Sequence, residues 1–292
     1  MMLNNYYDDA EHRIAIFEDT MGMCWENVDL SDAIDSTIEH TRLYRADKPV
    51  KTAKFQYEDT IITVTDERTL AAAKRLHAEF ADSRIAVLNF ASATNPGGGV
   101  KSGSTAQEES LCRCSTLYQC LDTDNLEQGF YRYHKKINDL RYTNTCIYTP
   151  DIVVFKSDTR FPELMNENDW FKVDVITCAA PNLRRIPYNR MNPGRGKAIT
   201  LSDSELLDIH KKRGRRILSV AAENSADVVV LGAFGCGAFA NNPRVVAQAY
   251  KDILTEFKGV FKAICFAVYC PPDNKTNYNV FSSTIIRKKT CL

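Results

Sequence analysis

Apolar side chains recur at helical spacing in the first 45 residues of the chain. In the segments AEHRIAIFEDTMGMC and SDAIDSTIEHTRLYR they return every three or four positions, which places them on one face of a helix. Ser31 opens the second segment and is a suitable N-cap. The pattern predicts an N-terminal helical extension over residues 1–50, packed on the rest of the protein.

Beyond the extension, short apolar runs alternate with longer amphipathic stretches. Short apolar runs predict strands with both faces buried, and the longer stretches predict helices between them. The predicted strands are residues 60–65, 85–90, 152–155, 173–177, 228–231 and 263–269. The predicted helices are residues 66–80, 106–121, 203–224 and 243–257, whereas residues 122–145 have weak periodicity.

Strands that alternate with helices are typical of an α/β fold with a mixed, mostly parallel sheet flanked by helices. The sequence contains no internal repeat and no segment with the composition of a domain linker. We therefore predict one main α/β domain over residues 51–292, preceded by the helical extension.

The net charge and the apolar segments give no sign of a nucleic-acid or membrane partner. The 37 Lys and Arg residues balance 37 Asp and Glu residues, so no net field draws the chain to nucleic acid or to a membrane. No apolar stretch approaches the roughly 20 residues of a membrane span. The polar N-terminus lacks the layout of a signal peptide. We expect no membrane association, no specific DNA or RNA binding, and a cytoplasmic protein.

Ten cysteines are scattered through predicted strands and helices, as buried thiols are in a reducing compartment. Cys112, Cys114 and Cys120 approach a metal-binding spacing, but no matching Cys or His pair follows. We therefore predict structural thiols and no metal site or cofactor.

Two glycine-rich loops follow predicted strands and lead into helices. The first glycine loop, residues 96–103, contains Gly97-Gly98-Gly99, and the second glycine loop, residues 232–239, reads GAFGCGAF. Such loops offer backbone N–H groups and the positive end of a helix dipole to an anion. Because ligands bind beyond the carboxyl ends of strands in α/β sheets, we expect the two loops to clamp a diphosphate. Simple tight turns would show the same glycines.

Gln107, Glu108 and Glu109 lie where the helix after the first glycine loop begins. Acidic residues in a first turn can serve only to complement the helix dipole. Beside a glycine-lined ligand site they can instead perform acid/base chemistry, because two adjacent carboxyl groups differ in protonation when one is buried.

The spacing GGG-x7-QEE over residues 97–109 resembles the signature of poly(ADP-ribose) glycohydrolases, and its surroundings are similar to the microbial type. Further similar blocks follow in family order: YTPDIVVFKSD (148–158), ITCAAPN (176–182), LGAFGCGAFANNP (231–243) and FAVYCPPDN (266–274). Agreement of several separate blocks is more specific than any one motif. The resemblance implies a macrodomain, with ADP-ribose in a cleft at the strand ends.

The resemblance also implies residue roles. Glu109 is similar to the family's catalytic glutamate, which protonates the leaving oxygen as the ribose C1″–O bond breaks, and Glu108 to the glutamate that holds the ribose hydroxyls. The residues implied in ADP-ribose binding are Asn95, Gly97, Gly98, Gly99, Val100, Gln107, Gly235, Cys236, Gly237, Ala238 and Phe239. Asn95 and Phe239 would contact the distal ribose, and Cys236 would offer only its N–H.

The function implied by the resemblance is hydrolysis of the ribose–ribose O-glycosidic bonds of poly(ADP-ribose), with release of ADP-ribose and no metal. Two alternatives stay open: a hydrolase of mono-ADP-ribosylated protein or of O-linked ADP-ribose, and a non-catalytic ADP-ribose-binding macrodomain. The pair Glu108 and Glu109 argues against the binding module, which needs no acid. The expected partners are poly(ADP-ribose) or ADP-ribosylated protein, bound by a monomer.

Three further features are assigned less directly. Tyr278 and Phe281 are candidates for the adenine contact by resemblance alone. The loop at 186–199, with Arg190, Arg195 and Lys197, is a candidate contact for the polymer. The basic run KKRGRR (211–216) lies in a predicted helix and favours a solvated face over a polyanion site.

Overall fold

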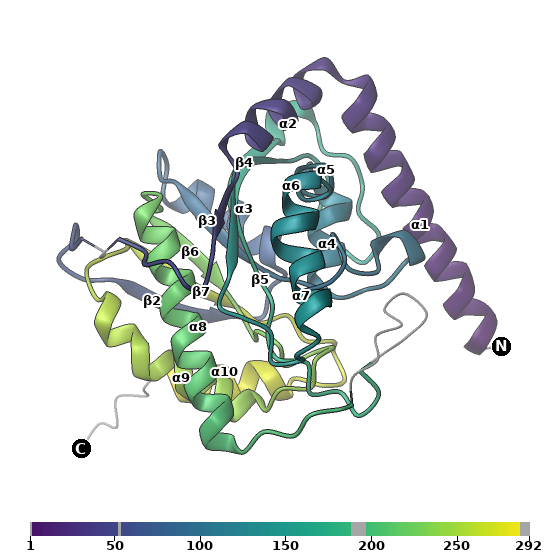
Figure 1. Cartoon of the computed structure of the whole chain (residues 1–292). Coiled ribbons are helices and arrows are strands. Elements are labelled where there is room, and N and C mark those ends of the chain that lie inside the picture. The colour runs from purple at the N-terminus through teal and green to yellow at the C-terminus, as the bar shows by residue number, and fades with distance from the viewer. Residues whose placement is uncertain (1, 52–53, 188–196, 287–292) are drawn as a thin grey trace.

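The structure is a computed structural model that describes residues 2–51, 54–187 and 197–286. One twisted sheet runs through the middle of the molecule, and helices pack on both of its faces (Figure 1). The arrangement has three layers, as expected for an α/β domain whose strands are apolar on both sides.

In the described residues, seven strands form the sheet in the order β1-β4-β5-β3-β6-β7-β2. The strands are β1 (Arg42–Tyr44), β2 (Ile61–Thr65), β3 (Ile85–Phe90), β4 (Cys146–Val154), β5 (Phe171–Cys178), β6 (Val228–Leu231) and β7 (Ala263–Ala267). β5, β3, β6, β7 and β2 pair in parallel, whereas β4 is antiparallel to both β1 and β5. The predicted mixed, mostly parallel sheet is confirmed.

The sheet divides the hydrophobic core into two. The helices are α1 (Met2–Glu26), α2 (Val28–His40), α3 (Thr69–Glu79), α4 (Gln107–Cys114), α5 (Leu117–Leu121), α6 (Asp124–Leu126), α7 (Arg132–Ile137), α8 (Asp203–Glu223), α9 (Pro243–Leu254) and α10 (Thr276–Ile285). In β3, Ile85 and Val87 join the core beneath α1–α6, while Ala86 and Leu88 join the core beneath α8–α10. Successive side chains of a strand point to opposite faces, which explains the continuous apolar run.

The N-terminal segment is helical, as predicted, but it also enters the sheet. Asn27 caps α2, since its Oδ1 accepts the N–H of Leu30 at 3.0 Å. Ser31, which was predicted to be the N-cap, is therefore inside the helix. After α2 the chain forms β1, which pairs along the edge strand β4. Three residues are too few to show a strand period in the sequence.

The region between β3 and β4 differs most from the prediction. The helix expected at 106–121 is two helices, because Thr116 donates its N–H to the carbonyl of Val153 at 3.1 Å and interrupts the helical hydrogen bonds. Residues 122–145, which lacked a clear pattern, contain α6, a π-helical turn over Glu127–Tyr131 and α7. Short helices of this kind are set by packing rather than by their own periodicity.

Two features of the C-terminal half were also not foreseen. Gly214 does not break α8: a Cβ there would lie 2.6 Å from Ile253 Cδ1, so the glycine lets α9 approach closely. α10 follows β7, and the side chain of Phe281 on α10 is fully buried against Phe266.

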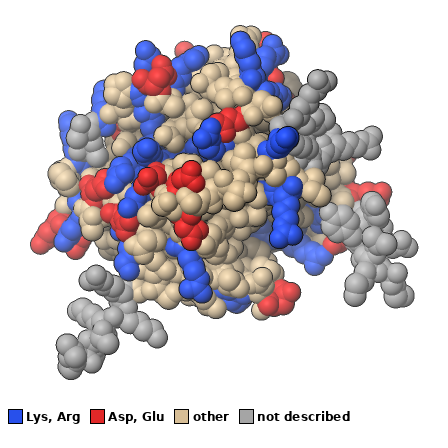
Figure 2. All heavy atoms as spheres, turned by 60° about the horizontal axis from the view of Figure 1, so that its bottom comes forward, with Lys and Arg blue, Asp and Glu red and all other residues tan. Residues whose placement is uncertain are grey.

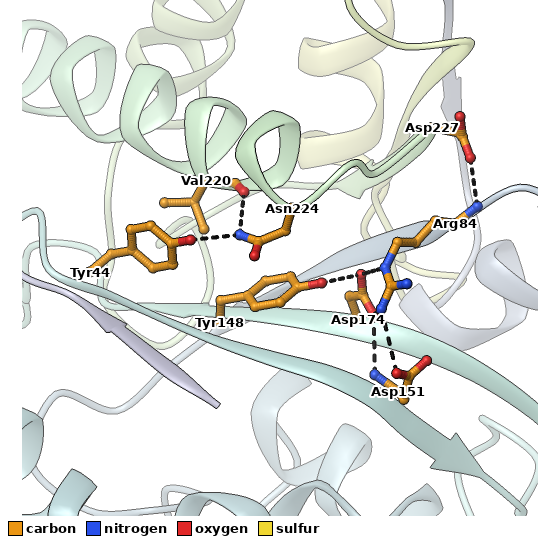
Figure 3. A network of polar contacts seen from close by, with 8 residues as sticks. All are labelled: Tyr44, Arg84, Tyr148, Asp151, Asp174, Val220, Asn224 and Asp227. Carbon is orange, nitrogen blue, oxygen red and sulfur yellow. Dashed lines mark hydrogen bonds and ion pairs between the residues drawn. The ribbon is translucent and has the colours of Figure 1, made fainter. Parts of the chain in front are cut away.

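A polar network ties the amino-terminal ends of the central strands together (Figure 3). Asp174 of β5 is 2% exposed and accepts hydrogen bonds from Tyr148 Oη and Arg84 Nε, each at 2.6 Å. The same carboxylate accepts the N–H of Asp151 at 3.1 Å, in the bulge of β4 where Asp151 has φ of 52°. Arg84 in turn donates its backbone N–H to Asp227, just before β6. This network lies at the opposite edge of the sheet from the glycine loops.

Most side chains of the basic run on α8 form ion pairs or hydrogen bonds within the protein. Arg215 pairs with Glu256 and Lys211 with Asp252. Arg213 is 2% exposed and donates to the backbone carbonyls of Ala179 and Arg141. Blue and red side chains are interspersed over the face drawn in Figure 2, consistent with a chain of no net charge. Lys212 of the run is exposed, as predicted for a solvated face, whereas Arg213 is buried and structural.

Candidate active site

The two glycine loops leave the same edge of the sheet. β3 and β6 are parallel neighbours, with Val87 opposite Val230, and each loop begins where its strand ends. Carboxyl ends of parallel strands meet at one edge, which is where α/β proteins bind their ligands.

The first glycine loop closes on the two carboxyl groups of α4. Gly97 and Gly98 have φ of 64° and 59°, the left-handed region that favours glycine. A Cβ on Gly98 would lie 2.6 Å from Oε1 of Glu109 and 3.0 Å from Oε2 of Glu108. A side chain at this position would therefore displace both carboxyl groups.

Glu108 is held from several sides in the first turn of α4. It is 2% exposed, its Oε2 accepts the N–H of Ser92 at 2.7 Å, and its Oε1 accepts from Asn89 Nδ2 at 3.2 Å. Burial, followed by the charge of Glu109, raises the pKa of Glu108 well above its ordinary value. Two buried carboxyl groups this close resist ionising together, so the pair favours keeping one proton.

Glu109 has one oxygen held and one oxygen free. The N–H of Gly99 donates to Oε1 at 2.9 Å, and the residue is 7% exposed. Oε2 has no hydrogen-bond partner among the described residues. A carboxyl group fixed through one oxygen can pass a proton from the other to a bound ligand, as a general acid does.

The second glycine loop is folded around Asn241. Gly235 has φ of 79°, and its carbonyl accepts the N–H of Asn241 at 3.0 Å. The side-chain Nδ2 of Asn241 donates to the carbonyls of Phe239 at 3.1 Å and Pro181 at 2.7 Å. Within the described part of the chain, the N–H groups of Gly237, Ala238 and Phe239 donate to no acceptor. These donors suit the oxygens of a diphosphate.

A cleft of about 260 Å³ connects the second glycine loop with the start of α4. Its lining includes Glu67, Arg68, Thr69, Phe90, Thr105, Ala106, Gln107, Ser110, Asp158, Ala180, Ala233, Phe234, Gly235, Gly237, Ala238, Phe239, Ala267, Val268, Tyr269 and Asn277. Glu108 and Glu109 are not in the lining, but they follow Gln107 directly in the same helical turn. The carboxyl pair therefore lies beside the cleft.

The remaining residues predicted to bind ADP-ribose differ in what they offer. Gln107 is in the lining, yet its side chain anchors α4 to β3, because Oε1 accepts the N–H of Phe90 and Nε2 donates to the carbonyl of Leu88. Val100 is fully buried in the core, so only its backbone is available. Asn95 is half-buried, and its Nδ2 contacts Thr94 Oγ1 at 3.3 Å.

Two other predicted residues belong to the second glycine loop. Cys236 is half-buried, and burial raises the pKa of its thiol, which makes it a poor nucleophile. Phe239 is half-buried between Tyr142, whose ring centroid is 6.2 Å away, and the guanidinium of Arg184 at 5.7 Å. The aromatic face of Phe239 is thus positioned at the margin of the cleft.

Sequence reasoning missed one wall of the cleft. The guanidinium of Arg68 lies 4.3 Å from the ring centroid of Tyr269. Asp158 accepts the hydroxyl of Ser110 at 2.8 Å and the N–H of Leu70 at 2.9 Å. These residues come from separate elements that meet at the ends of β2 and β7. Asp158 and Tyr269 lie in the family-like blocks 148–158 and 266–274, but nothing in the sequence assigned them to the cleft.

The expected adenine contacts need correction. Phe281 is fully buried in the core, so it cannot stack on a ligand in this cleft. Tyr278 packs against the same core and is not in the lining, although its neighbour Asn277 is. In the predicted polymer-contact loop, residues 188–196, with Arg190 and Arg195, lie outside the described residues, and Lys197 is exposed.

Nine described cysteines are free thiols, and eight of them are buried. Burial raises the pKa of Cys112, Cys114 and Cys120, so these thiols are packing residues. Over residues 2–51, 54–187 and 197–286, no three His, Cys, Asp or Glu side chains are grouped as metal ligands. No described helix is both long enough and apolar enough to cross a membrane.

The fold and the site together define a macrodomain-like α/β hydrolase: a mixed sheet between helices, with a glycine-lined cleft and paired carboxyl groups at the strand ends. The family described as microbial-type PARG, catalytic domain, matches residues 10–157. No curated protein matches the sequence.

Solved structures resemble most of the chain. The poly(ADP-ribose) glycohydrolase (PARG) of Thermomonospora curvata is 32% identical over 93% of this chain and 98% of that chain, with a TM-score of 0.80. The same enzyme bound to the inhibitor ADP-HPD is 33% identical over 92% of this chain and 98% of that one, with a TM-score of 0.77. The Deinococcus radiodurans enzyme in complex with ADP-ribose is 32% identical over 86% of this chain and 96% of that one, with a TM-score of 0.72. The chain therefore belongs to the microbial-type poly(ADP-ribose) glycohydrolase family and is a glycosidase.

Proposed function

We propose that this protein hydrolyses the ribose–ribose O-glycosidic bonds of poly(ADP-ribose), that it releases ADP-ribose, and that Glu109 is the general acid. The observation that carries the proposal is the state of the Glu109 carboxyl group. Its Oε1 is held 2.9 Å from the N–H of Gly99, and its Oε2 is unpartnered among the described residues. One buried carboxyl oxygen next to the first glycine loop is therefore left without a partner in the described protein.

The proposed reaction needs one proton from the carboxyl pair. Glu109 Oε2 donates this proton to the leaving ribose oxygen as the C1″–O bond breaks, and the ribose carbon becomes oxocarbenium-like. Water then attacks this carbon and returns a proton to Glu109, which restores the acid. Glu108 fixes the ribose through its hydroxyls. The raised pKa of Glu108 beside Glu109 is consistent with a pair that retains a proton for this step.

The second glycine loop is proposed to hold the diphosphate through the N–H groups of Gly237, Ala238 and Phe239. Their lack of acceptors within the described residues supports this role. Phe239 would pack against the distal ribose at the cleft margin, and Asn95 would contact that ribose from the first glycine loop. Glu109 serves as the acid and then as the base while Glu108 fixes the ribose, so the proposed reaction uses no metal.

The test measures which ADP-ribosylated substrates the protein cleaves and whether cleavage needs the Glu109 carboxyl group. Labelled poly(ADP-ribose) and proteins mono-ADP-ribosylated on Ser, Arg or Glu are incubated with the protein, with and without chelator. We expect polymer cleavage that chelator does not affect and that falls about 1,000-fold in Glu109→Gln. Glu39→Gln, an exposed carboxyl on α2, is the matched control and should retain full activity.

Each alternative function has its own signature in this test. Turnover of the mono-ADP-ribosylated proteins alone would identify a mono-ADP-ribosyl hydrolase. Binding of ADP-ribose with no turnover of any substrate would identify a binding module. Full activity in Glu109→Gln would overturn the mechanism. We also propose that the protein is a monomer and that it is cytoplasmic. The free, buried thiols support the cytoplasmic location, because such thiols persist in a reducing compartment.

A further inference from the structure

The N-terminal helix touches the end of the first glycine loop. α1, the purple helix at the edge of Figure 1, contacts both α4 and the 3₁₀ turn Val100–Ser102. Arg13 on α1 is 4% exposed, and its Nε donates to the carbonyl of Gly103 at 2.7 Å. The two residues are 90 positions apart in the chain. The charged side chain of Arg13 is therefore buried where it donates to the carbonyl of Gly103.

The backbone contact at the same place is equally close. Gly103 has φ of 70°, and a Cβ on it would lie 2.4 Å from the carbonyl oxygen of Ala10. The loop thus rests directly on the backbone of α1, and Arg13 holds it there from one turn further along the helix. Buried polar groups of this kind are costly to leave unpaired, so the contact has one favoured geometry.

The end of the loop is linked to Glu109 by two short steps. Ser104 donates its N–H to the carbonyl of Gly99 at 3.2 Å, and its own carbonyl accepts from Arg113 Nη1 at 2.8 Å. Gly99 then donates its N–H to Oε1 of Glu109. A shift of Gly103 and Ser104 would therefore move the donor that holds the carboxyl group.

A second buried arginine contacts the same end of the loop. Arg113 is 3% exposed, and its Nη1 donates to the carbonyl of Ser104, the residue after Gly103. Burial lowers the pKa of Arg113, and the charge of Glu109 opposes that shift. Two buried guanidinium groups, of Arg13 and Arg113, thus hold adjacent carbonyls at the end of the first glycine loop.

We infer that Arg13 is a positioning residue for Glu109: through Gly103 it fixes the first glycine loop so that the Gly99 N–H holds Oε1 and leaves Oε2 free. This inference rests on the proposed function of Glu109 as the acid. α1 then contributes to catalysis by positioning the first glycine loop. The cleft and the second glycine loop do not include Arg13, so ligand binding there should not depend on it.

The test uses Arg13→Gln and the conservative Arg13→Lys in the full chain. The control is Arg160→Gln, which removes a different ion pair of α1, that of Arg160 with Asp9. We expect kcat on poly(ADP-ribose) to fall about 10- to 100-fold in Arg13→Gln. The Kd for ADP-ribose should stay within about twofold, and Arg13→Lys should recover part of kcat because its ammonium can still donate to Gly103.

The mobility of the first glycine loop separates positioning from a loss of folding. Hydrogen exchange of the peptide covering residues 97–104 should become faster in Arg13→Gln and stay unchanged in Arg160→Gln.

The outcomes distinguish this inference from the proposed function. An Arg13→Gln enzyme with wild-type kcat and wild-type hydrogen exchange over residues 97–104 would overturn the inference alone. Equal losses of kcat, ADP-ribose affinity and melting temperature would also overturn it, because they would show a purely structural role. If the wild-type protein cleaves no polymer, the proposed function fails, and the exchange comparison still decides whether Arg13 holds the loop.

Discussion

The imidazole Nε2 of His210 lies 2.8 Å from the side-chain Oδ1 of Asn241, and this contact joins α8 to the second glycine loop. The amide N–H groups of Asn241 donate to the carbonyls of Phe239 and Pro181, so Oδ1 must accept and His210 Nε2 must donate. Burial lowers the pKa of His210 to about 4, so at neutral pH the ring is neutral and carries its proton on Nε2. Its Nδ1 is buried and has no partner among the described residues.

This geometry predicts that Asn241→Ala weakens ADP-ribose binding more than it slows the reaction. Without Nδ2 the carbonyl of Pro181 loses its donor and that of Phe239 keeps only the N–H of Leu183, so the loop proposed to bind the diphosphate relaxes. We expect the Kd for ADP-ribose, measured by calorimetry, to rise about tenfold or more, with kcat at saturation changed less than fivefold. Asn224→Ala, just after α8 at the opposite end of the sheet, is the control. An unchanged Kd would refute a bracing role for Asn241.

Gly98→Ala should nearly abolish turnover. The added Cβ would lie 2.6 Å from Glu109 Oε1 and 3.0 Å from Glu108 Oε2, at a φ of 59° that alanine avoids. Displacing a catalytic carboxyl group by about 1 Å costs on the order of 100-fold in rate. Steady-state cleavage of labelled polymer measures this. Gly22→Ala, where the new methyl group meets nothing within 4 Å, should keep full activity. Normal kcat in Gly98→Ala would show that the carboxyl pair tolerates displacement.

Asp174→Ala should destabilise the protein by about 3 kcal/mol without changing kcat. The substitution leaves the Tyr148 hydroxyl and the Asp151 N–H without their acceptor and removes the buried partner of Arg84. Arg84 and Asp227 directly precede β3 and β6, whereas the glycine loops follow the other ends of these two strands. Urea denaturation measures the free energy of unfolding. Asp151→Asn, which weakens only the exposed 3.5 Å ion pair of Asp151 with Arg84 Nη2, should change it by less than about 0.5 kcal/mol. If Asp174→Ala lowered kcat without lowering the free energy of unfolding, the polar network and the active site would not be independent.

Stability should fall as the pH drops from about 6.5 to about 4. Burial lowers the pKa of His134 and of His210 from 6.5 to about 4. Between these two pH values each histidine is protonated in the unfolded chain but still neutral in the folded chain. Each histidine therefore favours unfolding as the pH falls. The full contribution of each is at most about 3 kcal/mol, present above pH 6.5 and lost near pH 4.

Urea denaturation at pH 7, 5.5 and 4.5 measures this dependence. The double variant His134→Gln, His210→Gln should be less stable at pH 7, yet its stability should depend less on pH across the window. If the slope stays that of the wild type, other groups cause the acid sensitivity.

Local pattern was enough for the elements with the strongest periodicity. β3 and β6 match their predicted bounds because both faces of each strand are buried and the apolar run is unbroken. α8 begins at its predicted residue because Ser202 and Glu205 form a capping box. β1 and the helices between α5 and β4 escaped prediction, since contacts with distant residues rather than their own period stabilise them.

The sequence by itself determined that two glycine loops follow strands and that Glu108 and Glu109 follow the first loop, because these features are contiguous in the chain. Only the tertiary structure decided which carboxyl oxygen is held and which is free. It also decided that Arg13 reaches Gly103, that His210 reaches Asn241 and that Phe281 is in the core. These contacts join residues far apart in sequence, and their geometry depends on how whole helices pack on the sheet, which no local pattern encodes.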